Sequence, residues 1–167
     1  MWWWIAILGG GGIIAWQLIM RNVAPAVLPD NYKLFWGPIN AASAKYGVPI
    51  PVLYGILQQE SNGQLIEAGP DGHDRGPWQI NDIAHADWIA THDPLDPVAS
   101  TDYAASILAA GVQHFQDLRA GIASYNAGIG NVTVANPDVH TTGGDYSASV
   151  LAKADTFANL LGIDFTA

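Results

Sequence analysis

The sequence lacks cysteine and has few basic residues. None of its 167 residues is Cys, which excludes disulfide bonds and any metal site built on thiolate ligands. Lys and Arg number only six against 15 Asp and Glu, so the formal net charge is -9 at pH 7. Proteins that bind nucleic acid use Lys and Arg to neutralise phosphates, so this composition disfavours a nucleic-acid partner.

Histidine is another common metal ligand, and the sequence contains five. None of the five forms a His-x-x-x-His or similar pair. His85 and Asp87 could touch, but two solvated loop residues are the simpler interpretation. We therefore expect no metal ion and no other cofactor.

The N-terminal residues 2–20, WWWIAILGGGGIIAWQLIM, carry no charge. As a helix with a rise of ~1.5 Å per residue they would be roughly 28 Å long, enough to cross the hydrocarbon core of a bilayer. Trp2, Trp3 and Trp4 suit one membrane interface, and Arg21 suits the other. We expect residues 1–22 to form a single transmembrane anchor. A cleaved signal peptide, which would normally have a basic start, and a buried core helix are the alternatives.

The rest of the chain has a length that suits one domain with a core of ordinary size. Residues 23–31 contain two prolines and are typical of a linker. We assign residues 23–40 to this linker and a lead-in helix, and residues 41–163 to the main domain.

The main domain is expected to be mainly α-helical. Apolar periodicity and stop signals predict helices over residues 32–46, with a break near Gly37-Pro38, and over residues 98–116, 118–127 and 147–161. Gly-rich segments predict loops over residues 63–76 and 131–145, and a small β-hairpin within residues 63–81 is an alternative for the first loop.

Glu60 lies at the end of another predicted helix, for which Pro51 suits the first position. Leu53, Ile56, Leu57 and Glu60 follow an i, i+3, i+4, i+7 pattern, which puts the carboxyl group on the apolar face. Desolvation and the negative end of the helix dipole should both raise its pKa, making it a proton donor near neutral pH. The alternative is an exposed glutamate at a frayed helix end.

Amide and aromatic side chains occur at two further places. Gln79 and Asn81 follow the first loop, and Tyr125 and Asn126 end the helix before Gly128. Amides and aromatic rings suit the N-acetyl and hydroxyl groups of sugars, although a packed ring and a helix cap are the alternative for Tyr125 and Asn126. A carboxylic acid with such amides and no metal indicates cleavage of a glycosidic bond.

An ordered set of short motifs carries a resemblance to a known family. Glu60-Ser61 after an apolar helix, GPWQIN from Gly76 to Asn81, ASYNAG from Ala123 to Gly128 and the later Tyr146 occur in this order. The set resembles lytic transglycosylases of the soluble-lytic-transglycosylase type, which are related to goose-type lysozyme. The resemblance covers about residues 41–161.

The resemblance implies a lysozyme-like α fold that acts on the MurNAc-GlcNAc bond of peptidoglycan. Glu60 would be the single acid/base: it would protonate the leaving oxygen and then accept the proton of the MurNAc 6-hydroxyl, which closes a 1,6-anhydro ring. Ser61 corresponds to a serine that helps to hold the acid, and Tyr146 to a tyrosine that approaches it. Gln79, Tyr125 and Asn126 correspond to residues that line the sugar subsites, and Asn81 adds another amide.

Two departures from the family pattern matter. Pro77-Trp78 stands where Leu-Met is common, and we expect Trp78 to fill the core rather than stack on a sugar. The stretch Gly72-His-Asp74-Arg75-Gly76 resembles a Gly-Asp-Arg-Gly stretch of goose-type lysozymes, in which the Asp is thought to position a water. If Asp74 faces Glu60 across roughly 6.5–9.5 Å, inverting hydrolysis becomes possible. The alternatives are an Asp74-Arg75 loop contact and a solvated turn.

The leading hypothesis is a membrane-anchored lytic transglycosylase, and a muramidase that uses Asp74 is the second. A non-catalytic wall-binding or structural virion protein is the alternative from another class. A small catalytic domain on one membrane helix suits a phage that opens the cell wall locally. Other virion membrane or capsid proteins would then be its partners. A location in a bacterial cell envelope fits almost as well. Arg21 and Lys33 favour a cytoplasmic C-terminal side, whereas an enzyme acting outside needs the opposite orientation.

Overall fold

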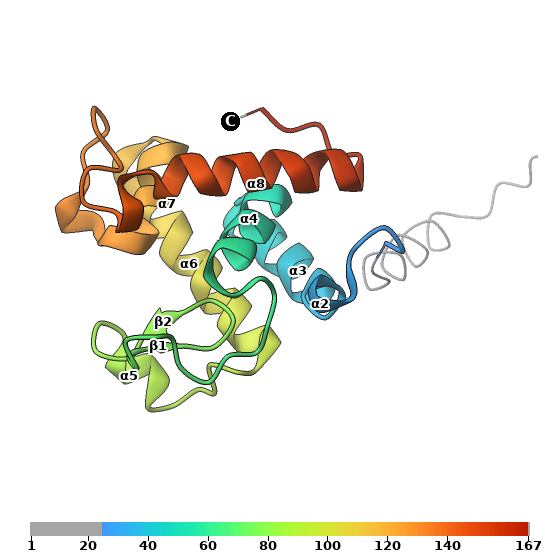
Figure 1. Ribbon diagram of the computed structural model, residues 1–167, viewed down its shortest axis with the longest axis horizontal. Coiled ribbons are helices and arrows are strands. Elements are labelled where there is room, and N and C mark those ends of the chain that lie inside the picture. The colour runs from blue at the N-terminus through green and yellow to red at the C-terminus, as the bar shows by residue number, and fades with distance from the viewer. Residues whose placement is uncertain (1–24, 167) are drawn as a thin grey trace, which may run out of the picture.

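Helix α4, Ile50–Ser61, is the central element of the fold. Its residues from Pro51 to Leu57 are buried all round, which explains why it is apolar on every face over that length. Helix α8, Tyr146–Leu161, packs along it at very close range, because a Cβ atom on Gly55 would lie 2.6 Å from the carbonyl oxygen of Val150. Figure 1 shows α8 lying along one side of the molecule above α4.

The computed structural model describes residues 25–166, and these are mainly helical. In addition to α4 and α8, this part of the chain contains α2 (Asp30–Lys33), α3 (Trp36–Tyr46), α5 (Ala86–Ile89), α6 (Pro97–Phe115), α7 (Leu118–Ala127) and the short 3-10 helices η1 (Ile129–Asn131) and η2 (Thr142–Gly144). The predicted helices over residues 98–116, 118–127 and 147–161 are confirmed within one residue at each end.

An aspartate side chain caps the N-terminal end of each of the helices α6 and α7. The side chain of Asp96 accepts a hydrogen bond from the Val98 amide before α6, and that of Asp117 accepts one from the Ala120 amide before α7. Between them the chain turns at Gln116, which has a left-handed φ of 53°. The two helices therefore pack against each other as a hairpin.

A two-stranded antiparallel hairpin forms in the predicted loop region, as the alternative interpretation allowed. β1 (Asp74–Arg75) pairs with β2 (Ile80–Asn81), with Asp74 opposite Asn81 and Arg75 opposite Ile80. The turn between them begins at Gly76, which has a left-handed φ of 71°. A Cβ atom on Gly76 would lie 2.1 Å from the carbonyl oxygen of Pro94, so there is no space for a side chain. In Figure 1 the hairpin and α5 form a small lobe apart from α4 and α8.

The N-terminal part of the described chain corrects one prediction. The break expected near Gly37-Pro38 lies instead at Leu34 and Phe35, and Pro38 lies within the first turn of α3. A proline is tolerated there because the first amides of a helix have no partner within it.

The lead-in segment also contributes to the core of the domain. Leu28, Tyr32 and Phe35 are buried in the same apolar cluster as α4, and the ring of Phe35 meets that of Trp78 edge-on. The expected transmembrane anchor at residues 1–22 lies outside the described residues. Within residues 25–166 no helix is long and apolar enough to cross a membrane.

Candidate active site

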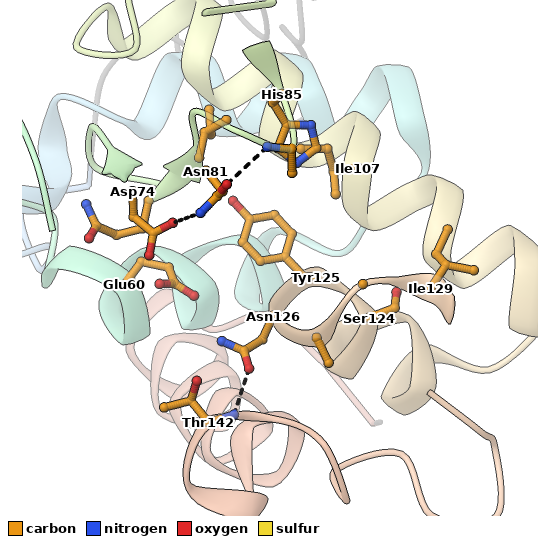
Figure 2. Close-up of a pocket in the computed structure, with 15 residues that line it drawn as sticks. Glu60, Asp74, Asn81, His85, Ile107, Ser124, Tyr125, Asn126, Ile129 and Thr142 are labelled. Carbon is orange, nitrogen blue, oxygen red and sulfur yellow. Dashed lines mark hydrogen bonds between the residues drawn. The ribbon is translucent and has the colours of Figure 1, made fainter. Parts of the chain in front are cut away.

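A cavity of about 520 Å³ lies where the C-terminal ends of α4 and α7 meet the hairpin. It is lined by six of the eight residues predicted from the sequence, namely Glu60, Asp74, Gln79, Asn81, Tyr125 and Asn126. Figure 2 shows Glu60 and Asp74 on one side of this cavity, with the ring of Tyr125 beside them. The fold thus brings together side chains from three separate stretches of the sequence.

Glu60 is a carboxyl group held largely out of water. It lies on the last turn of α4, and its Oε1 accepts a hydrogen bond from the hydroxyl of Tyr146, the first residue of α8. Burial raises the pKa of Glu60 to about 7; the Tyr146 hydrogen bond lowers it and the negative charge of Asp74 raises it further. The predicted direction of the pKa shift is confirmed, with desolvation as its main cause.

Ser61 and Tyr146 do not line the cavity but lie behind it. The buried hydroxyl of Ser61 donates to the carbonyl oxygen of Leu57, one turn back in the same helix, at 3.3 Å. Tyr146 is 2 % exposed and reaches the cavity only through Glu60. Of these two residues, the structure connects Tyr146 directly to the acid, whereas the role expected for Ser61 stays a prediction.

Asp74 points from β1 into the same cavity as Glu60. Its Oδ1 accepts a hydrogen bond from Nδ2 of Asn81 on the opposite strand, at 3.0 Å. The neighbouring Arg75 does not bind it, because the guanidinium donates to Oδ2 of Asp82 at 2.6 and 2.9 Å. The alternative of an Asp74-Arg75 contact is therefore wrong, and Asp74 is available to the cavity.

The two amides of the hairpin are held by local hydrogen bonds. Gln79 has a left-handed φ of 48°, and its Nε2 donates to the carbonyl oxygen of Gly76 at 2.8 Å. Oδ1 of Asn81 accepts from the amides of Ile83 and Ala84 at 3.1 and 3.0 Å, while its Nδ2 holds Asp74. The side-chain oxygen and one N–H of Asn81 are thus bonded within the protein, which makes it a residue that positions Asp74.

The residues at the end of α7 connect the cavity to its surroundings. The Tyr125 hydroxyl donates to the carbonyl oxygen of Trp78 at 2.8 Å. Figure 2 shows the second contact, in which Oδ1 of Asn126 accepts from the Thr142 amide at 2.8 Å. Trp78 is fully buried and its Nε1 donates to Thr101 at 3.0 Å. The prediction that Trp78 belongs to the core is confirmed.

His85 is a residue of the cavity that sequence reasoning treated as a solvated loop residue. It lies just before α5, and its Nδ1 is 3.0 Å from the hydroxyl of Tyr103. Burial lowers the pKa of His85, which favours the neutral ring. Only the tertiary placement of α5 against α6 reveals this position. Among residues 25–166, no group of three or more His, Asp or Glu side chains is arranged to hold a metal ion.

This arrangement suits acid-base chemistry on an uncharged polar substrate. A carboxyl group with a pKa of about 7 can donate a proton near neutral pH, and it lies beside a second carboxylate and several amide groups. Such pairs of carboxyl groups in different surroundings are typical of enzymes that cleave glycosidic bonds.

Comparison with known proteins agrees with this chemistry. The profile of the family described as "Transglycosylase SLT domain" matches residues 37–145. The chain is 31 % identical over 144 residues to "Lysozyme g" of Epinephelus coioides, which covers 74 % of both chains. It is 29 % identical over 138 residues to "Lysozyme g" of Casuarius casuarius, covering 77 % of this chain and 73 % of the relative.

A further relative, "Lysozyme g" of Takifugu rubripes, is 31 % identical over 150 residues, covering 80 % of this chain and 77 % of the relative. The family match spans α3 to η2, and it ends just before Tyr146 of α8. The resemblance inferred from the short motifs is therefore confirmed. The chain belongs to the transglycosylase SLT domain family, is related to the g-type lysozymes, and is an enzyme of the transglycosylase or lysozyme type.

Proposed function

We propose that the protein cleaves the β-1,4 bond between MurNAc and GlcNAc in peptidoglycan, with Glu60 as the acid. The observation that carries this proposal is the partly desolvated carboxyl group of Glu60, with its pKa raised to about 7, in a cavity lined by amides. Its family membership and its relatives named "Lysozyme g" support the same reaction class.

The leading form of the reaction is that of a lytic transglycosylase. Glu60 donates its proton to the glycosidic oxygen, and the bond from that oxygen to C1 of MurNAc breaks. The resulting Glu60 carboxylate then accepts the proton of the MurNAc 6-hydroxyl, whose oxygen bonds to C1 and closes the 1,6-anhydro ring. The proton count balances without water, and the Asp74 carboxylate would stabilise the positive charge that develops at C1.

Hydrolysis is the second candidate, and the position of Asp74 is the observation that favours it. Asp74 lines the same cavity as Glu60 and is held by Asn81 rather than by Arg75. A carboxylate in that position can accept a proton from a water that attacks C1 from the face opposite Glu60. In that reaction Glu60 gives up its proton once, and the product carries a reducing end.

Mass spectrometry of digested peptidoglycan distinguishes these two reactions. Products lighter by one water than reducing muropeptides, ending in 1,6-anhydro-MurNAc, would establish the lytic transglycosylase. Reducing ends would establish hydrolysis. If the folded protein sediments with peptidoglycan but releases no fragment, it is a wall-binding module and the proposed activity is wrong.

We also propose that residues 2–20 anchor the enzyme in a membrane, either the virion membrane of a phage or a bacterial cell envelope. The uncharged, Trp-flanked sequence supports this location. Flotation of the full-length protein with lipid vesicles tests it, and a variant with Ile14 replaced by Asp should float less. Equal recovery of both in the soluble fraction would contradict the anchor.

A further inference from the structure

Asp138 is a buried carboxylate that the proposed reaction does not use. It is 6 % exposed and lies between η1 and η2, in a segment whose sequence indicates only an irregular loop. Its Oδ1 accepts from the amide of Ser147 at 2.7 Å, and its Oδ2 accepts from the hydroxyl of Ser147 at 2.5 Å. Nη2 of Arg119, on α7, also donates to Oδ2 at 3.2 Å. One carboxylate thus joins α7, the loop and the first turn of α8.

The surroundings of Asp138 keep it ionised. Burial alone would raise its pKa, but the hydroxyl and amide of Ser147 together with Arg119 lower the pKa of Asp138 below its usual value. The charge lies at the N-terminal end of α8, where a carboxylate satisfies a free amide and complements the helix dipole. The contact is therefore a helix cap supplied from outside the helix.

The residue that this cap fixes most directly is Tyr146. The Tyr146 amide donates to the hydroxyl of Thr141 at 3.4 Å. That hydroxyl donates to the backbone carbonyl oxygen of Asp138 at 2.9 Å and, at 3.4 Å, to its Oδ1. The next residue, Ser147, is the one that Asp138 binds twice. The backbone of Tyr146 is consequently held on both sides by groups attached to Asp138, while its hydroxyl binds Glu60.

The same loop also supports the other side of the cavity. Thr142, which follows Thr141, donates its amide to Oδ1 of Asn126 at 2.8 Å. Both Thr142 and Asn126 line the cavity, whereas Asp138 does not. Asp138 therefore supports residues that line the cavity, but it does not line the cavity itself.

We propose that Asp138 is a positioning residue that fixes Tyr146 against the acid Glu60 and so sets the proton-donating behaviour of the active site. The inference rests on the proposed function of Glu60 as the acid. It predicts that removing the charge of Asp138 changes the catalysis of Glu60 in the same way as removing the Tyr146 hydroxyl.

The expected change has a definite sign. Glu60 is faced by Tyr146 from α8, by Tyr125 from α7 and by Asp74 from β1, and of these contacts the Tyr146 hydrogen bond lowers the pKa of Glu60. If Tyr146 moves away, the pKa of Glu60 rises. Because the protonated acid is the active form, the basic limb of the kcat/KM profile then moves to higher pH.

The test compares the pH profiles of Asp138→Asn, Tyr146→Phe and the double variant on purified glycan strands. We expect each single variant to move the basic limb up by about 0.5 pH unit and to lower kcat by about three- to tenfold with little change in KM. We expect no additional shift in the double variant, because both changes remove the same contact.

Two control variants separate positioning from general loss of stability. Ile39→Val removes one methyl group from the core away from the cavity, and should lower Tm without moving the profile. Asp102→Asn removes another aspartate that binds a cation and a hydroxyl, those of Lys45 and Tyr46, and should leave the profile unchanged. If Asp138→Asn does not fold, Ser147→Ala removes one of the two contacts and is measured in its place.

A profile of Asp138→Asn that coincides with the wild type, or a shift that adds to that of Tyr146→Phe, would overturn the inference. The proposed function fails in a different way. If Glu60→Gln keeps full activity, Glu60 is not the acid, whatever the Asp138 variant does. Loss of activity in Glu60→Gln with an unshifted Asp138→Asn profile rejects the positioning role alone.

Discussion

The two sides of the cavity are built by different physical means. The helical side, from α4, α7 and α8, carries Glu60 on elements that are buried in the apolar core; Leu57 one turn earlier is fully buried and Tyr146 is 2 % exposed. The hairpin side, from β1 and β2, has two residues in each strand, of which Ile80 is buried and the other three are half-buried. It is held by hydrogen bonds between polar groups.

This difference gives the two carboxyl groups different properties. Glu60 is desolvated by packing, which raises its pKa to about 7 and suits it to the proposed role of acid. Asp74 is oriented by a hydrogen bond from Asn81 and lies on the more exposed hairpin. Packing therefore supplies the proposed proton donor, and local hydrogen bonding directs the second carboxyl group toward it. Substitutions on the two sides should therefore affect activity and stability in different ways.

The largest effect is expected from Glu60→Gln on the helical side. The substitution keeps the shape and the oxygen that Tyr146 binds but removes the transferable proton, so kcat should fall by roughly 10²–10⁴-fold. Muropeptide release from purified peptidoglycan measures the loss. The only other glutamate in the chain, Glu67, is exposed, and Glu67→Gln is a matched control that should retain activity. Equal losses in the two variants would contradict the assignment.

Glu60→Gln should also stabilise the protein at high pH. Folding raises the pKa of Glu60 from 4.5 to about 7, so between these values the folded state keeps a proton that the unfolded chain has released. The free energy of unfolding of the wild type therefore falls as pH rises through this window, and above it the penalty is constant.

Because the variant lacks this ionisation, it should be more stable than the wild type at pH 8 by about 1–3 kcal/mol, and nearly equal to it at pH 4. Chemical denaturation at both pH values measures the difference. A constant difference between pH 4 and pH 8 would show that Glu60 is not desolvated, and would remove the contrast between the two sides of the cavity.

The sequence could predict the helical side because its signals are local. The apolar stripe that ends in Glu60 defines α4, and Asp117 and Gly128 bracket α7 at the predicted bounds. The desolvation of Glu60 also follows from that stripe. By contrast, Ser61 comes next in the sequence but points about 100° away around the helix, which explains why it lies outside the cavity.

The hairpin and the Asp138 network could not be derived in the same way. Two-residue strands are too short to show alternation, and β1 is fixed by contacts with β2 and with Asp82, which the sequence does not reveal. Asp138 gains its role from Arg119 and Ser147, which lie 19 residues before and nine residues after it. Such contacts depend on the tertiary fold rather than on local pattern.

Asp74→Asn on the hairpin side should cause a smaller loss than Glu60→Gln if the reaction is that of a lytic transglycosylase. The variant removes a charge that stabilises the transition state but leaves the acid in place, so kcat should fall by roughly tenfold. Mass spectrometry of the products provides the second measurement. A loss as large as that of Glu60→Gln, with reducing ends among the wild-type products, would identify Asp74 as the base of a hydrolase.

The hairpin side also depends on a contact outside the cavity, made by Asp82. Its Oδ2 accepts from Arg75, and its Oδ1 lies 3.0 Å from Nδ1 of His73. Asp82 therefore binds both residues that flank Asp74 in the sequence, and we call these two contacts the Asp82 clamp. Because side chains alternate along a strand, the Asp82 clamp directs Asp74 to the opposite face, toward Glu60.

Asp82→Asn should therefore lower kcat/KM by about two- to fivefold while changing stability by less than about 1 kcal/mol, because the ion pair is partly exposed. The loss of kcat/KM should disappear in the Asp74→Asn background, since the contacts of Asp82 then have no carboxylate charge to direct. Asp102→Asn, which breaks another partly exposed ion pair, controls for the loss of charge itself. An Asp82 effect that persists without the Asp74 carboxylate would mean that the clamp supports Gln79 or the turn. The hairpin side would then act on the substrate through its shape rather than by directing a charge.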